Sequence, residues 1–498
     1  MIDLKEFLKA LEDRGELLSV EEEMDCNLDI AAFAAMSNRN GAQAIHFKNI
    51  KGYPKNYTVA ANLLSGPGVS YPHKRTMWGR MAIAMGIDPH AEYESMIASI
   101  IDRCKNPIMP LKLNTGYCKE EIYKGKDVDL LKFPFPYLHQ GDGGRYGMGA
   151  LICKDPDSDW QNMGFYRFMI KDHDKIVADF LTEPALSSDT KTIFNKYRSR
   201  GETMPIAFVL GGAPAIPIAA AMKAPPGESE LALAGGLSLD TINLVKSETS
   251  DLLVPADAEM IIEGELLPTE MVEEGPYGTI KGYSSAVQRP LIKVRAITHC
   301  KDPVIPIIVD GTKVSDTQAI ISMIESARLT TVCQQDQLPV RWLQIPADWN
   351  LGIAMAAIFN MANGMAFRVA RLLAFSSNLF DKTFIVDSDL HPTSIDNVLN
   401  DLVHKCHPLR GERIMHGFPP AVMPNYGQGN PGEGCPRVYY DLCWPAWWKP
   451  EEKATPITFE SAFPDDIKEK VLKRWKEEFN MPLEPKVLPK LPQIGQQR

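Results

Sequence analysis

Residues 146–153 read Tyr-Gly-Met-Gly-Ala-Leu-Ile-Cys and are the first of four short apolar runs broken by glycine or proline. The other three runs are residues 206–212, 260–267 and 291–299. Short apolar segments separated by turn residues, with few long helical patterns, are typical of antiparallel or barrel-like β structure. We therefore predict a central β domain from residue 116 to residue 315.

The residues on either side of this segment predict two α/β domains. Within residues 1–115, leucine and phenylalanine recur between positions 4 and 11 at the spacing of one helical face, and residues 43–47 and 57–60 are strand candidates. Within residues 316–460, a helix candidate at 320–329 precedes an apolar strand at 384–386. Alternation of helices and strands in this way predicts an α/β unit at each end of the chain.

A further helix of the second α/β unit carries Val398, Leu399, Leu402 and Val403, and Thr393 or Ser394 can cap it. The most apolar stretch of the chain is residues 351–375. Polar side chains interrupt this stretch, so we predict a buried amphipathic helix there and no membrane span. The interrupting residues are Asn360, Asn363, Arg368 and Arg371.

Residues 461–498 predict a charged helix followed by an extended proline-rich tail. Ile467, Val471 and Trp475 share one face of this helix, and Phe479 lies beside them. A terminal helix with an apolar stripe is suited to docking on a second subunit. The predicted fold class is thus mixed α+β, with several domains and a C-terminal dimerisation helix.

The composition of the chain argues against some classes of protein. The chain has 498 residues and a net charge of −10, which argues against non-specific nucleic-acid binding. The charged, amphipathic start is not a secretory signal, and the nine cysteines form no CxxC pair, so a cytoplasmic enzyme is expected. His404, Cys406 and His407 are close in sequence, but we do not favour a metal site there because they precede Pro408 near a helix end.

Several polar residues in the central domain are suited to chemistry. Arg167 is a planar, permanently charged group for a carboxylate or a flavin edge, although an exposed strand arginine is an alternative. Asn162 offers an amide oxygen to a hard cation, and Glu248 is either a solvated acid or a ligand for Mg²⁺ or Mn²⁺. Glu274 directly precedes the turn Gly-Pro-Tyr-Gly at residues 275–278, where glycine and proline fix the acid in place.

In order along the chain, these segments resemble the UbiD family of reversible decarboxylases, which use prenylated FMN. The matching pieces are residues 154–157, 162–167, 247–249, 263–264, 274–278 and 386–389. Residues 127–131 and 141–144 look most like the branch that acts on aromatic acids. The resemblance implies that the central domain is a split β-barrel that binds flavin and is similar to those of flavin reductases.

The resemblance also implies roles for individual residues. Arg167 would lie against the flavin and pair with Glu274, and both would be catalytic. Asn162 and Glu248 would hold a divalent metal on the cofactor phosphate, typically Mn²⁺ with Mg²⁺ or Fe²⁺ as alternatives, and K⁺ would bind nearby. Met222 falls where the family has a methionine that contacts the flavin, and a packed core methionine is the alternative.

The sequence departs from the family pattern at two positions. Many members have a second glutamate directly after the turn, usually taken as the proton donor, and here that position is Thr279. The family's metal-binding histidine is also missing: the equivalent segment, residues 183–185, is Glu-Pro-Ala, so Glu183 is a candidate substitute ligand. His173 is too close to Arg167 to align with that histidine.

Three functional hypotheses follow. The first is reversible decarboxylation of an aromatic or α,β-unsaturated acid, such as a hydroxyaryl acid or an aryl-CoA thioester, with CO₂ as product or substrate. The second is a non-catalytic subunit of a larger carboxylase, and the third is a plain FMN oxidoreductase. For the first, we expect a flavin prenyltransferase to supply the cofactor and the chain to form a homodimer or homohexamer.

Overall fold

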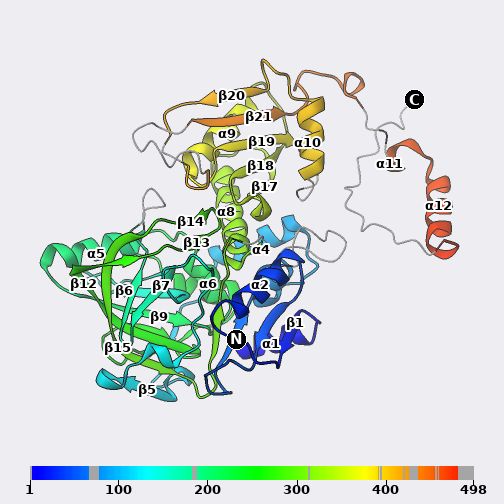
Figure 1. Cartoon of the computed structure of the whole chain (residues 1–498). Coiled ribbons are helices and arrows are strands. Elements are labelled where there is room, and N and C mark those ends of the chain that lie inside the picture. Colours follow the sequence, from blue (N-terminus) through cyan, green and yellow to red (C-terminus); the bar gives the residue numbers. More distant parts are fainter. Residues whose placement is uncertain are drawn as a thin grey trace.

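The computed structural model describes residues 3–66, 78–181, 188–311, 314–390, 392, 395–418, 421–424, 436–454, 457 and 459–479. These residues form three packed units (Figure 1): a barrel in green, an N-terminal unit in blue, and a C-terminal unit in yellow and orange. The long helix α8 (Asp316–Gln335) runs from the lower two units into the C-terminal one. The predicted α+β class with several domains is confirmed.

A closed antiparallel barrel of six strands forms the central unit. Its strand order is β12-β9-β6-β7-β8-β15, and pairing of β12 with β15 closes it. The four apolar runs predicted as strands lie in four of the six. The strands are β6 (Tyr146–Lys154), β7 (Gln161–Asp172), β8 (Lys175–Ala178), β9 (Met204–Leu210), β12 (Met260–Glu274) and β15 (Val287–His299).

Side chains of these strands alternate between two hydrophobic clusters. Leu151, Phe168 and Phe208 point into the barrel, where they are fully buried. Ala150 and Phe165 point outward and pack with the helices around the barrel. Helices and short strands surround it, namely β4 (Leu111–Lys112), β5 (Glu121–Lys124), α5 (Asp189–Arg200), α6 (Ala215–Ala220), α7 (Glu230–Ser238), β10 (Asn243–Lys246), β11 (Leu253–Pro255), β13 (Gly278–Thr279) and β14 (Gly282–Tyr283).

The N-terminal unit is a four-stranded sheet with helices, and its fourth strand comes from far along the chain. Its order is β1-β2-β3-β16, where β16 pairs in parallel with β3. The predicted boundary at residue 315 is therefore too simple, because residues 304–307 leave the barrel and complete the first sheet. The elements are α1 (Leu4–Glu12), β1 (Leu17–Val20), α2 (Asp29–Arg39), β2 (Ala44–Phe47), β3 (Thr58–Ala61), α3 (Gly79–Ala84), α4 (Tyr93–Lys105) and β16 (Val304–Ile307).

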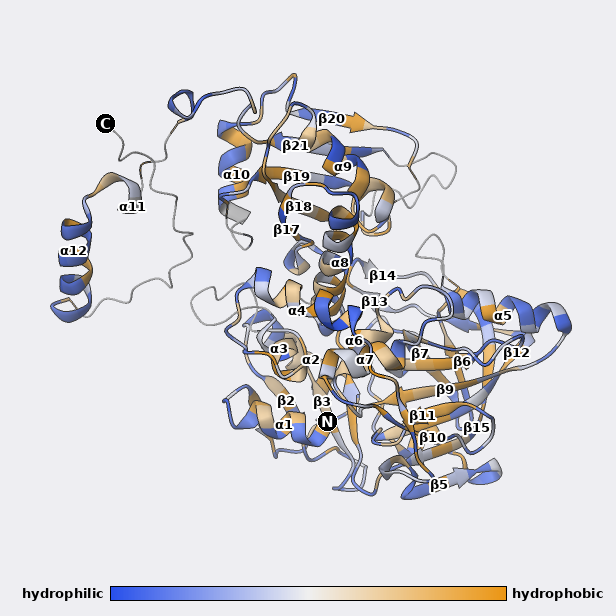
Figure 2. Ribbon diagram, turned by 180° about the vertical axis from the view of Figure 1, so that it is seen from behind, coloured by the Kyte–Doolittle hydropathy of each residue, from blue (hydrophilic) through white to orange (hydrophobic). Residues whose placement is uncertain are grey.

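The C-terminal unit is a five-stranded sheet with the order β17-β18-β19-β21-β20. Alternate residues of β18 face opposite sides: Ala354 and Ala356 share a cluster with α9, and Met355 and Ala357 share one with α10. Figure 2 shows these strands as mostly hydrophobic between the two helices. The elements are β17 (Val340–Gln344), β18 (Ile353–Ile358), α9 (Met365–Ser376), β19 (Lys382–Asp387), α10 (Ile395–His404), β20 (Glu412–Met415) and β21 (Arg437–Leu442).

The single helix predicted for residues 351–375 is wrong, because the stretch is divided into β18 and α9. Polar and glycine residues at 360–364 end the strand, and Gly364 has the left-handed φ of 80° directly before the helix. The proposed caps Thr393 and Ser394 lie outside the described residues.

The last described residues form two helices, α11 (Phe459–Ala462) and α12 (Asp465–Glu477). Helix α12 buries none of its residues and lies away from the three units in both views (Figures 1 and 2). Ile467, Val471 and Trp475 are each about two-fifths exposed, as one apolar stripe. Among the helices of the described residues, none is both long and apolar enough to cross a membrane.

Candidate active site

A buried ion pair joins the middle of β7 to the end of β12. The Arg167 guanidinium donates from Nε to Oε1 of Glu274 at 2.9 Å and from Nη2 to Oε2 at 3.1 Å. Glu274 is completely buried, and the peptide bond that follows it, Gly275–Pro276, is cis. The structure thus brings together the arginine and the glutamate that the sequence analysis paired, in the bidentate geometry that suits guanidinium and carboxylate.

Further side chains hold this pair in place. Asp179, just after β8, accepts from Arg167 at 3.1 Å and from Nε of Arg289 at 2.6 Å. Tyr146 donates to Glu274 at 3.2 Å, and the Tyr277 ring lies 4.7 Å below the Arg167 guanidinium. Burial alone lowers the pKa of Arg167, but its hydrogen bonds and the charges of the two acids outweigh burial and raise it.

Sequence reasoning missed Asp179. It stands alone after a short strand, with no motif around it, so only the closure of the barrel reveals that it neighbours Arg167. Its carboxylate joins two arginines from β7 and β15. The cluster therefore carries two buried acids and two guanidinium groups, which keeps Arg167 fixed in one orientation.

A second group of polar side chains surrounds the start of β7. Asn162 is 4% exposed and donates from Nδ2 to Oγ1 of Thr190 at 2.9 Å. Glu230, the first residue of α7, is 3% exposed and accepts from the backbone N–H of Met163 at 3.0 Å. Burial raises the pKa of Glu230 to about 7. A buried carboxylate with no cationic partner among the described residues is suited to a metal ion.

The structure does not support Glu248 as the partner of Asn162. Its carboxylate pairs with Nζ of Lys119 at 2.6 Å and also with Nζ of Lys124, near the edge strand β5. Two ammonium groups already compensate its charge, whereas Glu230 contacts β7 at the backbone N–H of Met163, the residue after Asn162. The prediction for Glu248 came from spacing within a matching segment, and spacing does not show which acid the fold places next to β7.

The remaining predicted residues give no further ligand. Glu183 lies outside the described residues. His173 is an exposed residue whose Nδ1 bonds Asp129 at 2.8 Å. Within the described ranges, no three or more His, Cys, Asp or Glu side chains gather closely enough to hold a metal by themselves. The half-buried Met222 has its sulfur 3.8 Å from the Cys104 thiol, as in ordinary core packing, so its contact with flavin stays a prediction.

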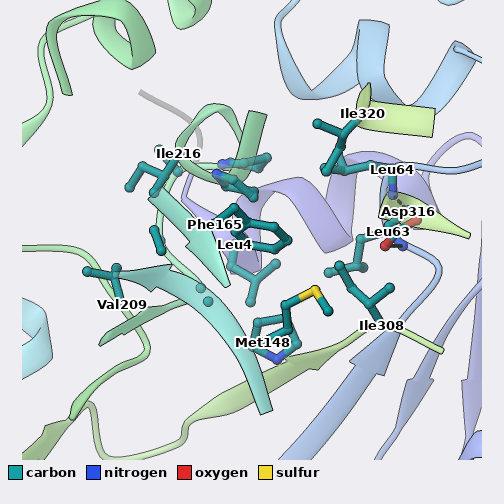
Figure 3. A pocket seen from close by; sticks show the side chains of 18 of the residues that line it. Leu4, Leu63, Leu64, Met148, Phe165, Val209, Ile216, Ile308, Asp316 and Ile320 are labelled. Atoms are coloured by element: carbon teal, nitrogen blue, oxygen red, sulfur yellow. Dashed lines mark hydrogen bonds between the residues drawn. The ribbon is translucent and has the colours of Figure 1, made fainter. Parts of the chain in front are cut away.

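An apolar pocket adjoins the ion pair. Met148 stands opposite Arg167 in the β6–β7 ladder, and Phe165 precedes Arg167 by two residues, so all three project from the same face. Met148 and Phe165 line a pocket that is partly open to solvent. Figure 3 shows side chains of the barrel unit on one side of it and Leu63, Leu64, Ile308, Asp316 and Ile320 on the other.

This arrangement can bind a planar anionic molecule. The cavity walls are mainly aliphatic and aromatic and remove water from whatever they enclose. Arg167 supplies a fixed positive charge from the same face, and its charge-assisted bonds are strong because the surroundings are buried. A ring lying against the apolar wall with a carboxylate or flavin edge toward Arg167 satisfies both features.

The chain resembles known proteins over most of its length. Residues 8–100 match the model of the 3-octaprenyl-4-hydroxybenzoate carboxy-lyase N-terminal domain, UbiD_N, and residues 111–313 match that of the Rift-related domain, UbiD. The chain is 29% identical over 492 residues to a pyrrole-2-carboxylic acid decarboxylase of Pseudomonas aeruginosa. That alignment covers 95% of this chain and 97% of the relative.

Solved structures also share the fold of this chain. The UbiD-class enzyme HmfF from Pelotomaculum thermopropionicum, in complex with FMN, superposes with a TM-score of 0.81 at 26% identity, covering 93% of this chain and 99% of that one. An evolved dimeric form of HmfF, in complex with prFMN, gives a TM-score of 0.79 at 25% identity, covering 94% and 100%. In both, the shared fold extends over almost the whole of each chain.

Proposed function

Because the chain belongs to the UbiD family and is a carboxy-lyase, we propose that it removes CO₂ from an aromatic carboxylic acid without oxidation, using prenylated FMN. The reverse reaction, carboxylation of the aromatic product, is available at the same site. A hydroxyaryl acid or an aryl-CoA thioester is the substrate class that we favour. The relative that acts on pyrrole-2-carboxylic acid supports an aromatic substrate.

The observation that carries the proposal is the buried Arg167–Glu274 pair beside an apolar cavity. A hydrolase or a simple binding module has no need for a bidentate ion pair beside such a cavity. A decarboxylase has that need, because it must orient a carboxylate and then expel CO₂ from a site that excludes water.

The residues present fit the cofactor. Glu230 is a buried carboxylate with no cationic partner among the described residues, and it contacts the first residues of β7. Asn162 is also one of the first residues of β7. These are hard oxygen ligands, and together with Glu183 they are our candidates to hold Mn²⁺, Mg²⁺ or Fe²⁺ against the phosphate of the flavin. When bound, the modified flavin supplies an electron sink for the carbon that loses CO₂.

The chain's own residues bind, orient and exclude water. Arg167 attracts the flavin edge or the substrate carboxylate, and Asp179 keeps its guanidinium from turning away. Glu274 has one oxygen that also accepts from Tyr146, so the acid cannot rotate freely. Met148 and Phe165 form the wall against which a ring lies flat.

The two alternative functions have less support. A non-catalytic subunit has no physical reason to keep two buried acids and two arginines in contact, because buried charges are costly unless a function selects them. A plain FMN oxidoreductase needs a second redox partner, and the chain has no nicotinamide fingerprint. We also propose that α12 joins subunits and that a flavin prenyltransferase supplies the cofactor.

Co-expression with a flavin prenyltransferase tests this function. The purified protein should retain prenylated FMN, identified by its absorption spectrum and by mass spectrometry. It should then release CO₂ anaerobically from at least one member of a panel of aromatic acids. Protein from cells without the prenyltransferase is the control and should be inactive on the same panel. Failure to retain the modified flavin, or no CO₂ from any acid, would refute the proposal.

A further inference from the structure

The sequence leaves the proton donor of this enzyme unassigned, since Thr279 stands where many relatives carry a second glutamate. Thr279 does not fill that role. Its hydroxyl donates to the carbonyl oxygen of Gly282 at 2.7 Å and accepts from the N–H of Lys281, so it closes the β13–β14 turn. A hydroxyl also does not release a proton near neutral pH.

Another acid lies next to this position in space. The carbonyl oxygen of Thr279 lies against Gly311, 3.4 Å from where a Cβ on that glycine would project. The residue before Gly311 is Asp310, which is 5% exposed. The fold therefore places a buried carboxyl beside the backbone of the residue that lacks one, although 31 positions of sequence separate them.

Two residues that flank Asp310 in the chain, Ile308 and Asp316, line the cavity beside Met148 (Figure 3). Thr317 links Asp310 to the barrel wall: it bonds the Asp310 carboxyl, and its Oγ1 lies 3.9 Å from the sulfur of Met148. Met148 stands opposite Arg167 in the β6–β7 ladder, and the charge of Arg167 acts on the Asp310 carboxyl, so the acid and the ion pair lie near one another.

Hydrogen bonds fix the position of the Asp310 carboxyl. Ser315 donates from Oγ to Oδ1 at 2.8 Å, and Ser315 is itself the N-cap of α8. His139 bonds the backbone carbonyl of Asp310 through Nε2 at 2.8 Å. The hydroxyl donors stabilise the carboxylate that remains after a proton leaves, so the group can release a proton and still remain buried.

A buried hydroxyl near Asp310 has no hydrogen-bond partner within the described part of the chain. Tyr277 is 1% exposed, and its hydroxyl has no hydrogen-bond partner among the described residues. It lies within electrostatic range of both Asp310 and Arg167. Because buried polar groups are almost always bonded, we expect water or a ligand atom at this hydroxyl.

From this geometry we propose that Asp310 donates the proton that replaces CO₂ on the substrate. The assignment rests on the proposed decarboxylase function. When the bond to CO₂ breaks, CO₂ leaves without the bonding electron pair. The substrate carbon then takes the proton of the Asp310 carboxyl, and the resulting carboxylate takes a new proton from solvent before the next turnover.

The electrostatic surroundings agree with an acid that holds its proton. Burial raises the pKa of Asp310 and outweighs the lowering by Ser315, Thr317, His139 and Arg167. Tyr277 is a further titratable group near it. Asp316 on α8 is close in sequence, but its carboxylate accepts the backbone N–H groups of Leu63 to Ser65. The rate should therefore fall as the pH rises through the pKa of Asp310.

The test is Asp310→Asn, which keeps the shape and the bond from Ser315 but has no acidic proton. We expect kcat to fall at least ~100-fold, with KM and retained flavin unchanged, because general acids contribute about 10²–10⁴-fold. Asp310→Glu should retain part of the rate. Asp441→Asn is the matched control, since Asp441 is a partly buried acid of the C-terminal sheet whose pKa burial also raises.

Two further measurements keep the test decisive. Thr279→Glu added to Asp310→Asn should recover activity, because the backbone of residue 279, which would carry the new carboxyl, lies beside the segment that holds Asp310. In flavin-free protein, infrared difference spectra should show a protonated carboxyl that Asp310→Asn removes and Asp441→Asn retains.

The outcomes separate this inference from the proposed function. Full kcat in Asp310→Asn, or an unchanged carboxyl signal in its spectrum, overturns the role of Asp310 and leaves the decarboxylase standing. Natural enzyme that retains the carboxyl signal but releases no CO₂ refutes the proposed function alone. Loss of both rate and signal, followed by recovery with Thr279→Glu, supports the inference.

Discussion

Replacing Glu274 by glutamine tests the buried ion pair more sharply than any other change. The amide keeps the shape of the side chain but removes its charge, so the two bonds of 2.9 and 3.1 Å from Arg167 become one weaker contact. Arg167 retains Asp179 at 3.1 Å, so its charge is not left alone. We expect a stability loss of about 2–3 kcal/mol, below the ~3–5 kcal/mol found when a buried charge loses its only partner.

Turnover should fall much further than stability. If Glu274 positions Arg167 and takes part in proton movement, kcat should fall about 10²–10⁴-fold, which corresponds to ~3–5 kcal/mol of barrier. The measurements are kcat and KM with the best acid of the panel, bound flavin by absorbance, and thermal unfolding of the same samples. Flavin should remain bound, since Arg167 is still in place.

Glu325→Gln is the matched control. Glu325 is 6% exposed and forms a bidentate pair with Arg328, with both distances 2.7 Å. It should lose similar stability and keep its turnover. The reasoning is refuted if Glu274→Gln retains more than about a tenth of kcat. It is equally refuted if Glu325→Gln loses as much activity, because general destabilisation would then explain both.

Three further predictions concern metal, pH and assembly. Glu230→Gln should lose the bound divalent metal by elemental analysis, whereas Glu248→Gln should keep it; the reverse result would restore the spacing-based assignment. Burial raises the pKa of the Asp257 carboxyl from 3.8 to about 6. As the pH rises from about 4 to 6, the carboxyl therefore loses its proton in the unfolded chain before it does so in the folded one, and the folded state loses stability. Asp257→Asn should raise the unfolding temperature at pH 7 but not at pH 3.5, and equal effects at both would exclude this cause. Val471→Asp in α12 should reduce the oligomer in light scattering, with unchanged circular dichroism; an unchanged mass would exclude α12 from the interface.

The barrel was predictable because its sequence pattern is local. Short apolar runs with regular turn residues report strand structure directly, and the residues around 146–153, 206–212, 260–267 and 291–299 form strands as expected. The stretch 351–375 shows the limit of this method. A continuous apolar run is compatible with a buried strand and with a buried helix, and only the polar interruption near Asn360 separates the two.

The site was predictable only where a motif fixes the residue. Glu274 is marked by the turn that follows it, and Arg167 by its distance from Asn162. Glu230 and Asp310 have no such mark. Glu230 begins a helix of alanine, leucine and glycine, 67 residues after Met163, whose N–H it accepts, and nothing in the sequence reports that contact. Only the packed fold shows which distant acids meet β7.

The return of β16 to the first sheet has a consequence for how the chain is made. Strand β3 pairs with β2 on one side and with β16 on the other, so its second edge is open until residues 304–307 are available. During synthesis, the N-terminal sheet cannot be completed until about two hundred further residues have left the ribosome. A fragment that stops at residue 115 would expose that edge permanently and should aggregate, although its own predicted elements are all present.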